Sequence, residues 1–187
     1  MLRKHVTEIS SLFHNFNDEP ENINKHTFTK KDYPQKKRNT ALILATTSSS
    51  SNSERSILQK KLGNKHEDNM LDKYETLINK QITQRNNELY TMNITINGKT
   101  IEVVGKVDGI IDNSILIEHK RRMRGIKNNI PFHEIVQCYM YMKMTDLKTT
   151  HLIQSFGEHI KTDIIQFDEN IWTQILSRCN LLSDLFS

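Results

Sequence analysis

Three charged side chains stand in the segment of this chain that otherwise looks most like a buried core. Asp108 follows a mostly apolar run at 103–107, and a second apolar run at 115–117 leads into Glu118 and Lys120. Burying a charge is costly unless it is paired or binds a metal ion. Two carboxylates that converge on one point form a hard, oxygen-rich site suited to Mg²⁺ or Mn²⁺. A lysine beside such a site can orient or deprotonate a water and stabilise charge that develops on a phosphate.

This metal-site hypothesis depends on the turn between the two strands. Side chains alternate across a strand, so Glu118 and Lys120 share one face while His119 points to the other and is expected to be structural. A three-residue turn at 112–114 would pair Asp108 with Glu118, whereas a two-residue turn would place them on opposite faces. We therefore expect an odd-length turn or a bulge. The alternative for the same residues is an Asp–Lys–Glu salt bridge on a solvated sheet face.

A helix that precedes these strands directs a histidine toward the same core. Ser51 and Glu54 match a capping box, and residues facing the core then recur at every fourth position, a series that includes His66. A single inward histidine is more often an ordinary core residue than a ligand. Glu67 beside it could add another carboxylate, and an exposed place on the helix explains it equally well.

A second helix, expected at about 132–144, carries Gln137 and Tyr141 four residues apart. Residues at this spacing stack on one helical face, where an amide and a phenol could hold Lys120 or a DNA phosphate. The alternative is ordinary packing, with Tyr141 in the core and Gln137 at the surface.

The other apolar patterns predict an α/β (α+β) fold with a central mixed sheet, built on a three-strand antiparallel meander and flanked by helices. Asn97 and Gly98 supply the first tight turn of the meander, and Asp168 caps the last helix. The predicted elements are a helix within 1–16, a loop or flexible arm at 17–39, a helix from Ser51 to about 78, the meander over 94–120, a helix at 132–144, strands at 152–156 and 160–167, and a helix after 168.

The residues of the proposed site resemble a known signature. The segments 105–108, Gly-Lys-Val-Asp, and 118–120, Glu-His-Lys, look like the motif of the PD-(D/E)XK nuclease superfamily, here without its proline. Gln137 and Tyr141 are similar to the Q-x-x-x-Y motif of the RecB-like branch. The segment 63–67, Gly-Asn-Lys-His-Glu, resembles that branch's Gly-and-His element, and all four elements occur in the family's order.

The resemblance implies a restriction-endonuclease-like core of order αβββαβ that cleaves nucleic acid with one or two Mg²⁺ or Mn²⁺ ions. Gln137 and Tyr141 would position the lysine and the nucleic-acid backbone, and Glu67 would serve a second ion or support the ligands. The metal ligands it implies are His66, Asp108 and Glu118. The catalytic residues it implies are Asp108, Glu118, Lys120, Gln137 and Tyr141.

The likeness covers about residues 53–186. We therefore expect a nuclease core at 51–187, preceded at 1–50 by an N-terminal helix and a flexible basic segment that matches nothing recognisable. The branch includes RecB nuclease domains, lambda-type exonucleases, viral alkaline and recombination exonucleases, and the mitochondrial genome maintenance exonuclease. It favours an exonuclease acting on single-stranded or duplex DNA ends in recombination, repair or replication, and the small size and Asn-, Lys- and Ile-rich composition fit a viral source.

Two alternatives remain at this stage. Within the enzyme class the alternative is an endonuclease, cutting DNA or, like cap-snatching enzymes, RNA. In a different class, the scaffold only binds nucleic acid or a protein partner, and its site is silent; loss of an acid or of the lysine would have signalled this, and all are present. Lambda-like relatives form rings and RecB-like ones sit inside helicases, so the oligomeric state is left open.

Positive charge is concentrated rather than spread, although the net charge of the chain is only +4. Such clusters can hold phosphates without reading sequence, and the second cluster begins inside the proposed site, although a solvated face is the ordinary explanation. The first cluster is Lys30, Lys31, Lys36, Lys37 and Arg38. The second contains Lys120 and the expected nucleic-acid contacts Arg121, Arg122, Arg124 and Lys127.

Composition excludes several other classes. No apolar run approaches the roughly 20 residues needed to span a bilayer, and the first residues lack the apolar region of a signal peptide, so we expect an intracellular protein. Cys138 and Cys179 are expected to be buried free thiols, and two cysteines are too few to ligate an iron–sulfur cluster.

Overall fold

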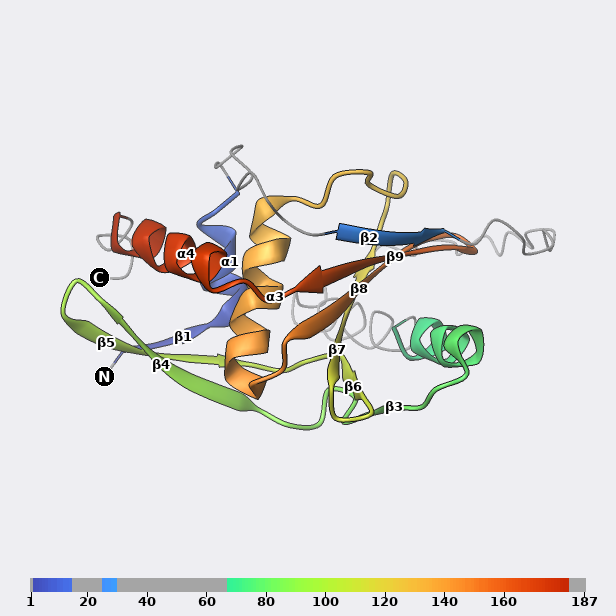
Figure 1. The fold of residues 1–187 in the computed structure, drawn as a ribbon, viewed down its shortest axis with the longest axis horizontal. Coiled ribbons are helices and arrows are strands. Elements are labelled where there is room, and N and C mark those ends of the chain that lie inside the picture. The colour runs from blue at the N-terminus through green and yellow to red at the C-terminus, as the bar shows by residue number, and fades with distance from the viewer. Residues whose placement is uncertain (1, 15–24, 30–66, 182–187) are drawn as a thin grey trace, which may run out of the picture.

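Two β-sheets and a central helix form the frame of the protein, which we describe from a computed structural model (Figure 1). Residues 2–14, 25–29 and 67–181 are described, and 25–29 only as backbone. The smaller sheet has the strand order β1-β5-β4, and the larger sheet has the order β2-β9-β8-β7-β6-β3. This arrangement of sheets flanked by helices confirms the predicted fold class and is consistent with a restriction-endonuclease-like core.

The smaller sheet is built on the predicted Asn97–Gly98 hairpin. Strands β4 (Tyr90–Ile96) and β5 (Lys99–Gly105) pair in antiparallel fashion with Ile96 opposite Lys99. Both turn residues have positive φ, 45° and 76°, as expected for this turn. The third strand, β1 (Leu2–His5), runs parallel to β5. The predicted N-terminal helix is therefore shorter than expected, because its first turn is a strand and only α1 (Val6–Ser11) is helical.

The larger sheet is mixed, because β7 and β8 are parallel and the other pairs are antiparallel. Its central strands are β6 (Gly109–Ile111), β7 (Ile115–Arg121), β8 (Thr149–Phe156) and β9 (His159–Gln166), and its edge strands are β3 (Ile82–Thr83) and β2 (Lys25–Thr29). The prediction of a loop or arm across 17–39 is wrong for β2, whose backbone pairs with β9. Pairing with a distant strand leaves no pattern in a short polar segment.

The predicted meander is present, but its middle strand is divided between the two sheets. β5 ends at Gly105, the segment 106–108 has no strand pairing, and β6 begins at Gly109. Asp108 therefore occupies the break between the sheets rather than a ladder position. This break places the acid at the point where the two sheets meet.

Helix α3 (Phe132–Thr145) stands at the centre of the molecule, with α4 (Glu169–Leu181) and the β4–β5 hairpin toward one end (Figure 1). Almost its whole circumference is buried, as expected for a helix that packs on several sides. The Oδ1 atom of Asp168 accepts hydrogen bonds from the N–H groups of Asn170 and Ile171, which confirms the predicted cap of α4.

The two faces of the larger sheet have separate hydrophobic cores. One core joins Leu116 and Leu152 to α1, α3 and α4, and it contains Val6, Ile9 and Phe13. The other joins Ile117 and Ile153 to Leu71 and Tyr74 of a helix whose described residues are 67–78. Residues 2–14 thus pack with the main core, while the predicted boundary at residue 50 lies outside the described residues.

Three further expectations concern smaller features. Cys138 and Cys179 are buried free thiols, as predicted. Among the described residues, no helix is long and apolar enough to cross a membrane. The basic cluster at 30–38 and the capping box at Ser51 fall outside the described part of the chain.

Gly105 provides a test of the packing between the end of β5 and α3. A Cβ at this position would lie 2.6 Å from Cε1 of Tyr141 and 2.9 Å from Cγ2 of Val6. Because an aromatic ring and a helix must shift to accept it, we expect Gly105→Ala to lower the free energy of unfolding by about 1–3 kcal/mol. Urea denaturation measures this loss. The neighbouring Lys106→Ala, at an exposed position, should change stability by less than about 0.5 kcal/mol, and an equal effect of both changes would contradict the packing argument.

Candidate active site

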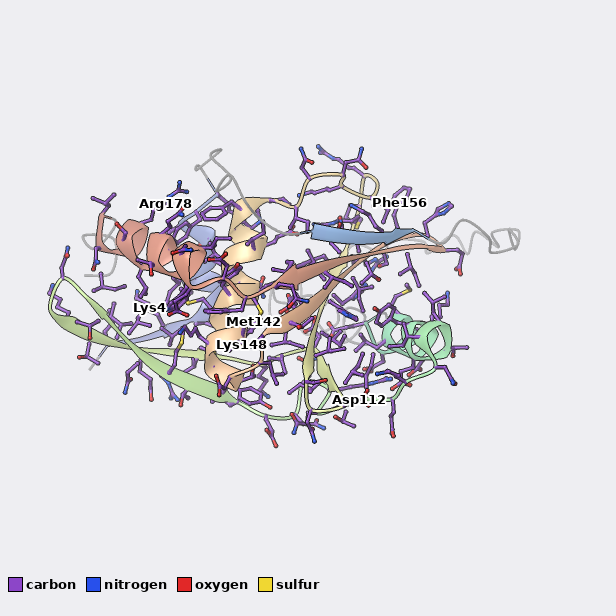
Figure 2. The ribbon with its side chains drawn as sticks, viewed as in Figure 1. Lys4, Asp112, Met142, Lys148, Phe156 and Arg178 are labelled. Atoms are coloured by element: carbon purple, nitrogen blue, oxygen red, sulfur yellow. The ribbon has the colours of Figure 1, made fainter. Side chains whose placement is uncertain are left out.

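The turn between β6 and β7 has three residues, as the metal-site hypothesis requires. Ile111 pairs with Ile115 and Gly109 with Ile117, so the next position of this register sets Asp108 opposite Glu118. Asp112 and Asn113 both adopt φ of 51°, which their short polar side chains tolerate. Asp112 lies at the edge of the molecule on this turn (Figure 2). The predicted odd-length turn is confirmed, and this register, continued by one residue, would place the two acids on one face.

Asp108 closes the end of the β6–β7 ladder with its side chain. Its Oδ2 atom accepts a hydrogen bond of 2.7 Å from the backbone N–H of His119. This N–H lies just beyond Gly109 and Ile117, the last paired residues of β6 and β7. This bond fixes one oxygen of Asp108 beside the strand that carries Glu118.

Lys120 contacts two of the predicted site residues, Glu118 and Gln137. Its Nζ atom lies 2.6 Å from Oε1 of Glu118 and donates a 2.7 Å hydrogen bond to Oε1 of Gln137. The amide of Gln137 in turn donates to the hydroxyl of Tyr141 at 3.4 Å. Gln137 and Tyr141 thus face the strands. The alternative that Gln137 is a surface residue is wrong, because only 7% of this residue is exposed.

The electrostatics of the site combine burial with crowded negative charge. Burial raises the pKa of Asp108 well above its usual value, and the charges of Glu118 and Glu67 raise it further. For Lys120, burial alone would lower the pKa, but the charge and hydrogen bond of Glu118 outweigh burial and the pKa is raised. A cation placed among these carboxylates would relieve the repulsion that raises the pKa of Asp108.

One oxygen of this cluster has no hydrogen-bond partner among residues 2–14 and 67–181. Oε1 of Glu118 meets Lys120, whereas Oε2 is buried without a hydrogen-bond partner among the described residues. A buried carboxylate oxygen in this state carries a large desolvation penalty, and a divalent ion would offset it. The chemistry of Asp108 and Glu118 therefore fits Mg²⁺ or Mn²⁺, although no group of three or more His, Cys, Asp or Glu is placed to hold a metal within the described ranges.

The helix element of the proposed site is only partly described. His66 lies outside the described residues, so its role as a ligand stays a prediction. Glu67, half-buried at the start of the described helix, accepts a hydrogen bond from Nδ2 of Asn86. The backbone N–H of Asn86 donates to the carbonyl of Val107 at 3.2 Å, which ties this helix to the residue before Asp108. Burial raises the pKa of Glu67, and Glu118 adds to the rise.

His119 lies on the opposite face of β7, as alternation requires. Its Nε2 atom is 2.8 Å from Oγ of Ser155 on β8. Burial lowers its pKa to about 4, and the charges of Lys120 and Arg121 contribute to the fall. A neutral imidazole bonded to a serine in the sheet matches the structural role expected for it.

The predicted nucleic-acid contacts divide into two groups. Arg121, Arg124 and Lys127 are exposed, whereas the side chain of Arg122 is only 8% exposed. Its Nη1 and Nη2 atoms donate to the two carboxylate oxygens of Glu134 at 2.5 and 2.6 Å. In this structure Arg122 therefore fastens the loop 122–131 to α3 rather than facing solvent. Its contact with nucleic acid stays a prediction. Such a contact would require Arg122 to give up its bidentate pair with Glu134.

Two residues with no role predicted from the sequence, Glu134 and Gln154, contact this region. Glu134 pairs with Arg122, and Oε1 of Gln154 accepts from Nε of the same arginine at 2.8 Å. Gln154 follows only two apolar residues in a strand whose other members are mostly polar, so its position gave little signal. Glu134 gave none, because an acid in the first turn of a helix is common.

Comparisons with known proteins give likenesses of fold. No protein-family profile and no curated protein matches the chain. Among solved structures, SSO0001 superposes with a TM-score of 0.50 at 20% identity, over 70% of this chain and 62% of SSO0001. An alkaline exonuclease from Laribacter hongkongensis, LHK-Exo, gives a TM-score of 0.46 at 15% identity, and its complex with dAMP gives 0.45 at 15%. Both LHK-Exo comparisons cover 62% of this chain and 61% of that protein. The chain thus spans less than two thirds of each of these proteins.

The Arg122–Glu134 pair should stabilise the fold in a pH-dependent way. Burial would raise the pKa of Glu134, but its bonds to Arg122 outweigh burial and lower it. A lowered carboxyl pKa means that the stabilisation is complete above the usual glutamate pKa of about 4.3 and is lost as the pH falls through the lower folded value. We expect Glu134→Gln to cost about 3 kcal/mol in the free energy of unfolding at pH 7 and clearly less near pH 3, measured by urea denaturation at both pH values.

The matched control is Glu158→Gln, which removes an exposed pair with Lys73. Exposed pairs contribute at most about 1 kcal/mol, so this variant should stay close to the wild type at both pH values. A Glu134→Gln variant with the same small effect would show that the buried pair does not hold the loop.

Proposed function

We propose that this chain is a divalent-metal-dependent nuclease that hydrolyses phosphodiester bonds of DNA. The observation that carries the proposal is the carboxylate of Glu118, with one oxygen on Lys120 and the other buried without a hydrogen-bond partner in the described part of the chain. An acid pair short of one cation, beside an ammonium group, is the arrangement needed to hold an ion and a phosphate together. The resemblance of the same residues to the PD-(D/E)XK signature supports the assignment.

Each residue has a distinct part in this proposal. Asp108 and Glu118 hold the ion, with His66 as a further ligand, and a bound Mg²⁺ or Mn²⁺ supplies Lewis-acid polarisation of a phosphate oxygen. Lys120 uses two of its three N–H donors on Glu118 and Gln137, which leaves the third for a water or a phosphate oxygen. Gln137 and Tyr141 keep the ammonium group aimed at that point.

The resemblance to the RecB-like branch favours an exonuclease that processes DNA ends in recombination, repair or replication, including in a viral setting. An endonuclease acting on DNA or RNA is the second candidate. The third is a silent module that binds nucleic acid, which is disfavoured by the intact set of Asp108, Glu118 and Lys120.

Removing the lysine or the acid should slow cleavage strongly. We expect Lys120→Ala and Asp108→Ala each to lower the rate of DNA hydrolysis with Mg²⁺ or Mn²⁺ by about 10²-fold or more, because each removes charge stabilisation at the reacting phosphate. A labelled-DNA assay with saturating metal measures the rates. EDTA should stop the wild type, and added Mg²⁺ or Mn²⁺ should restore it.

Lys99→Ala is the control, since this exposed lysine lies in the β4–β5 hairpin away from the acids. It should retain wild-type cleavage. Cleavage by Lys120→Ala and Asp108→Ala at the wild-type rate would rule out the mechanism, and binding without cleavage of DNA or RNA by the wild type would favour the silent module.

The mode of cleavage can be determined with three substrates. We expect duplexes labelled at the 5′ or the 3′ end to be shortened progressively from one end, and a covalently closed circle to remain intact, because an exonuclease requires a terminus. Product sizes on denaturing gels give the polarity. Linearisation of the circle would instead identify an endonuclease.

A further inference from the structure

The face of the sheet that carries Lys120 continues onto the neighbouring strands. In the register of the larger sheet, Lys120 on β7 pairs with Gln154 on β8, which pairs with Lys161 on β9. Side chains of directly paired residues lie on the same face of a sheet. Gln154 is therefore the immediate neighbour of the proposed catalytic lysine across the sheet.

The amide of Gln154 uses its full hydrogen-bonding capacity on one loop and one carboxylate. Its Oε1 atom accepts from Nε of Arg122 at 2.8 Å and from the backbone N–H of Lys127 at 3.1 Å. Its Nε2 atom donates to the carbonyl of Lys127 at 3.1 Å and to Oδ2 of Asp163 at 2.7 Å. Two lone pairs and two N–H groups are all that an amide offers, and this side chain is 0% exposed.

The loop 122–131 is fastened by other buried groups as well. Nζ of Lys161, which pairs with Asp163 at 2.9 Å, donates to the carbonyls of Lys127 and Asn128 at 3.1 and 3.3 Å. A surface loop usually satisfies its backbone with water, so anchoring by buried charged side chains is unusual. Apolar side chains could stabilise the sheet equally well, so stability alone does not explain this network.

Three exposed side chains of this segment are cationic, and the other exposed residues are Met123, Asn128 and Asn129. Arg121 ends β7, and Arg124 and Lys127 follow on the loop, all exposed and within seven positions of Lys120 in the sequence. Fixing a loop before it binds reduces the entropy lost on binding, which favours a preformed contact surface. Cations on such a surface recognise a repeated phosphate backbone without reading bases.

We propose that Gln154 is a positioning residue that fixes the loop 122–131, so that Arg124 and Lys127 contact the nucleic-acid backbone while Lys120 contacts the reacting phosphate. The assignment of a nucleic-acid partner rests on the proposed function. The geometry of the loop stands independently of it. Gln154 acts through the loop and touches no substrate.

The test uses Gln154→Met, which keeps the length of the side chain and removes its hydrogen bonds. Gln166→Met is the control, a substitution of the same type at an exposed position on the same sheet. Binding of a fluorescently labelled duplex is measured by anisotropy in EDTA between about 50 and 200 mM salt. We expect Gln154→Met to bind about 10-fold more weakly and the slope of log K against log salt to fall by about 1–2, since each lost phosphate contact removes about 0.9. Cleavage with Mg²⁺ should show a raised KM with kcat within about 3-fold of the wild type.

A double-mutant cycle separates this positioning role from a general structural one. If Gln154 acts through the loop, Arg124→Ala should weaken binding clearly in the wild type and much less in Gln154→Met. Equal effects of Arg124→Ala in both backgrounds, or an unchanged salt slope in Gln154→Met, would overturn the proposal. If Gln154→Met does not fold, Lys161→Met removes the anchors on Lys127 and Asn128 and serves the same cycle with the same outcomes.

Failure of this inference can be told apart from failure of the proposed function. A wild type that binds the duplex in EDTA but never cleaves it would refute the nuclease proposal, and the salt slopes would still decide the role of Gln154. A wild type that cleaves, with Gln154→Met unchanged in binding and KM, would refute the positioning role alone. A wild type that binds no nucleic acid would refute both.

Discussion

The ammonium group of Lys120, held between Glu118 and Gln137, is the interaction on which the rest of the site depends. A lysine this close to the core is tolerated only because a carboxylate 2.6 Å away and an amide 2.7 Å away replace its water. With Asp108 and Glu67 nearby, the carboxylates outnumber the ammonium group. Burial first and these neighbouring charges second raise the pKa of Asp108, and a bound cation would lower it again.

Several features of the fold follow from bringing these charges together. The middle strand of the meander breaks at 106–108, where the carboxylate of Asp108 accepts a hydrogen bond from the backbone N–H of His119. The three-residue turn then sets Glu118 opposite it. Helix α3, buried nearly all round, contributes Gln137 and Tyr141 to the same face. A one-residue change in the turn would reverse the face of every side chain on β7, so the turn length is as important to the site as the acids.

The features that could be predicted from the sequence depend on residues close together in the chain. The hairpin at Asn97–Gly98 follows from the φ angles these residues accept, the turn at 112–114 from counting residues, and the pairing of Gln137 with Tyr141 from helical spacing. The features that were missed depend on distant partners. Strand β1 pairs with β5, and β2 pairs with β9, although neither segment has a local sequence pattern that predicts its partner. The division of the meander between two sheets likewise has no local signal.

The adjacent residues Arg121 and Arg122 show how a local rule could have gone further. Treated as members of one charge cluster, both were expected to contact nucleic acid. Strand alternation, the same rule that put Glu118 and Lys120 on one face, also puts Arg122 on that face and Arg121 on the other. The structure has this arrangement, with Arg122 paired to Glu134 of α3 and Arg121 exposed. Basic residues at the end of a strand should therefore be assigned alternately to its two faces rather than treated as one surface. Those on the inward face need buried acceptors, and those on the outward face are free to contact a phosphate.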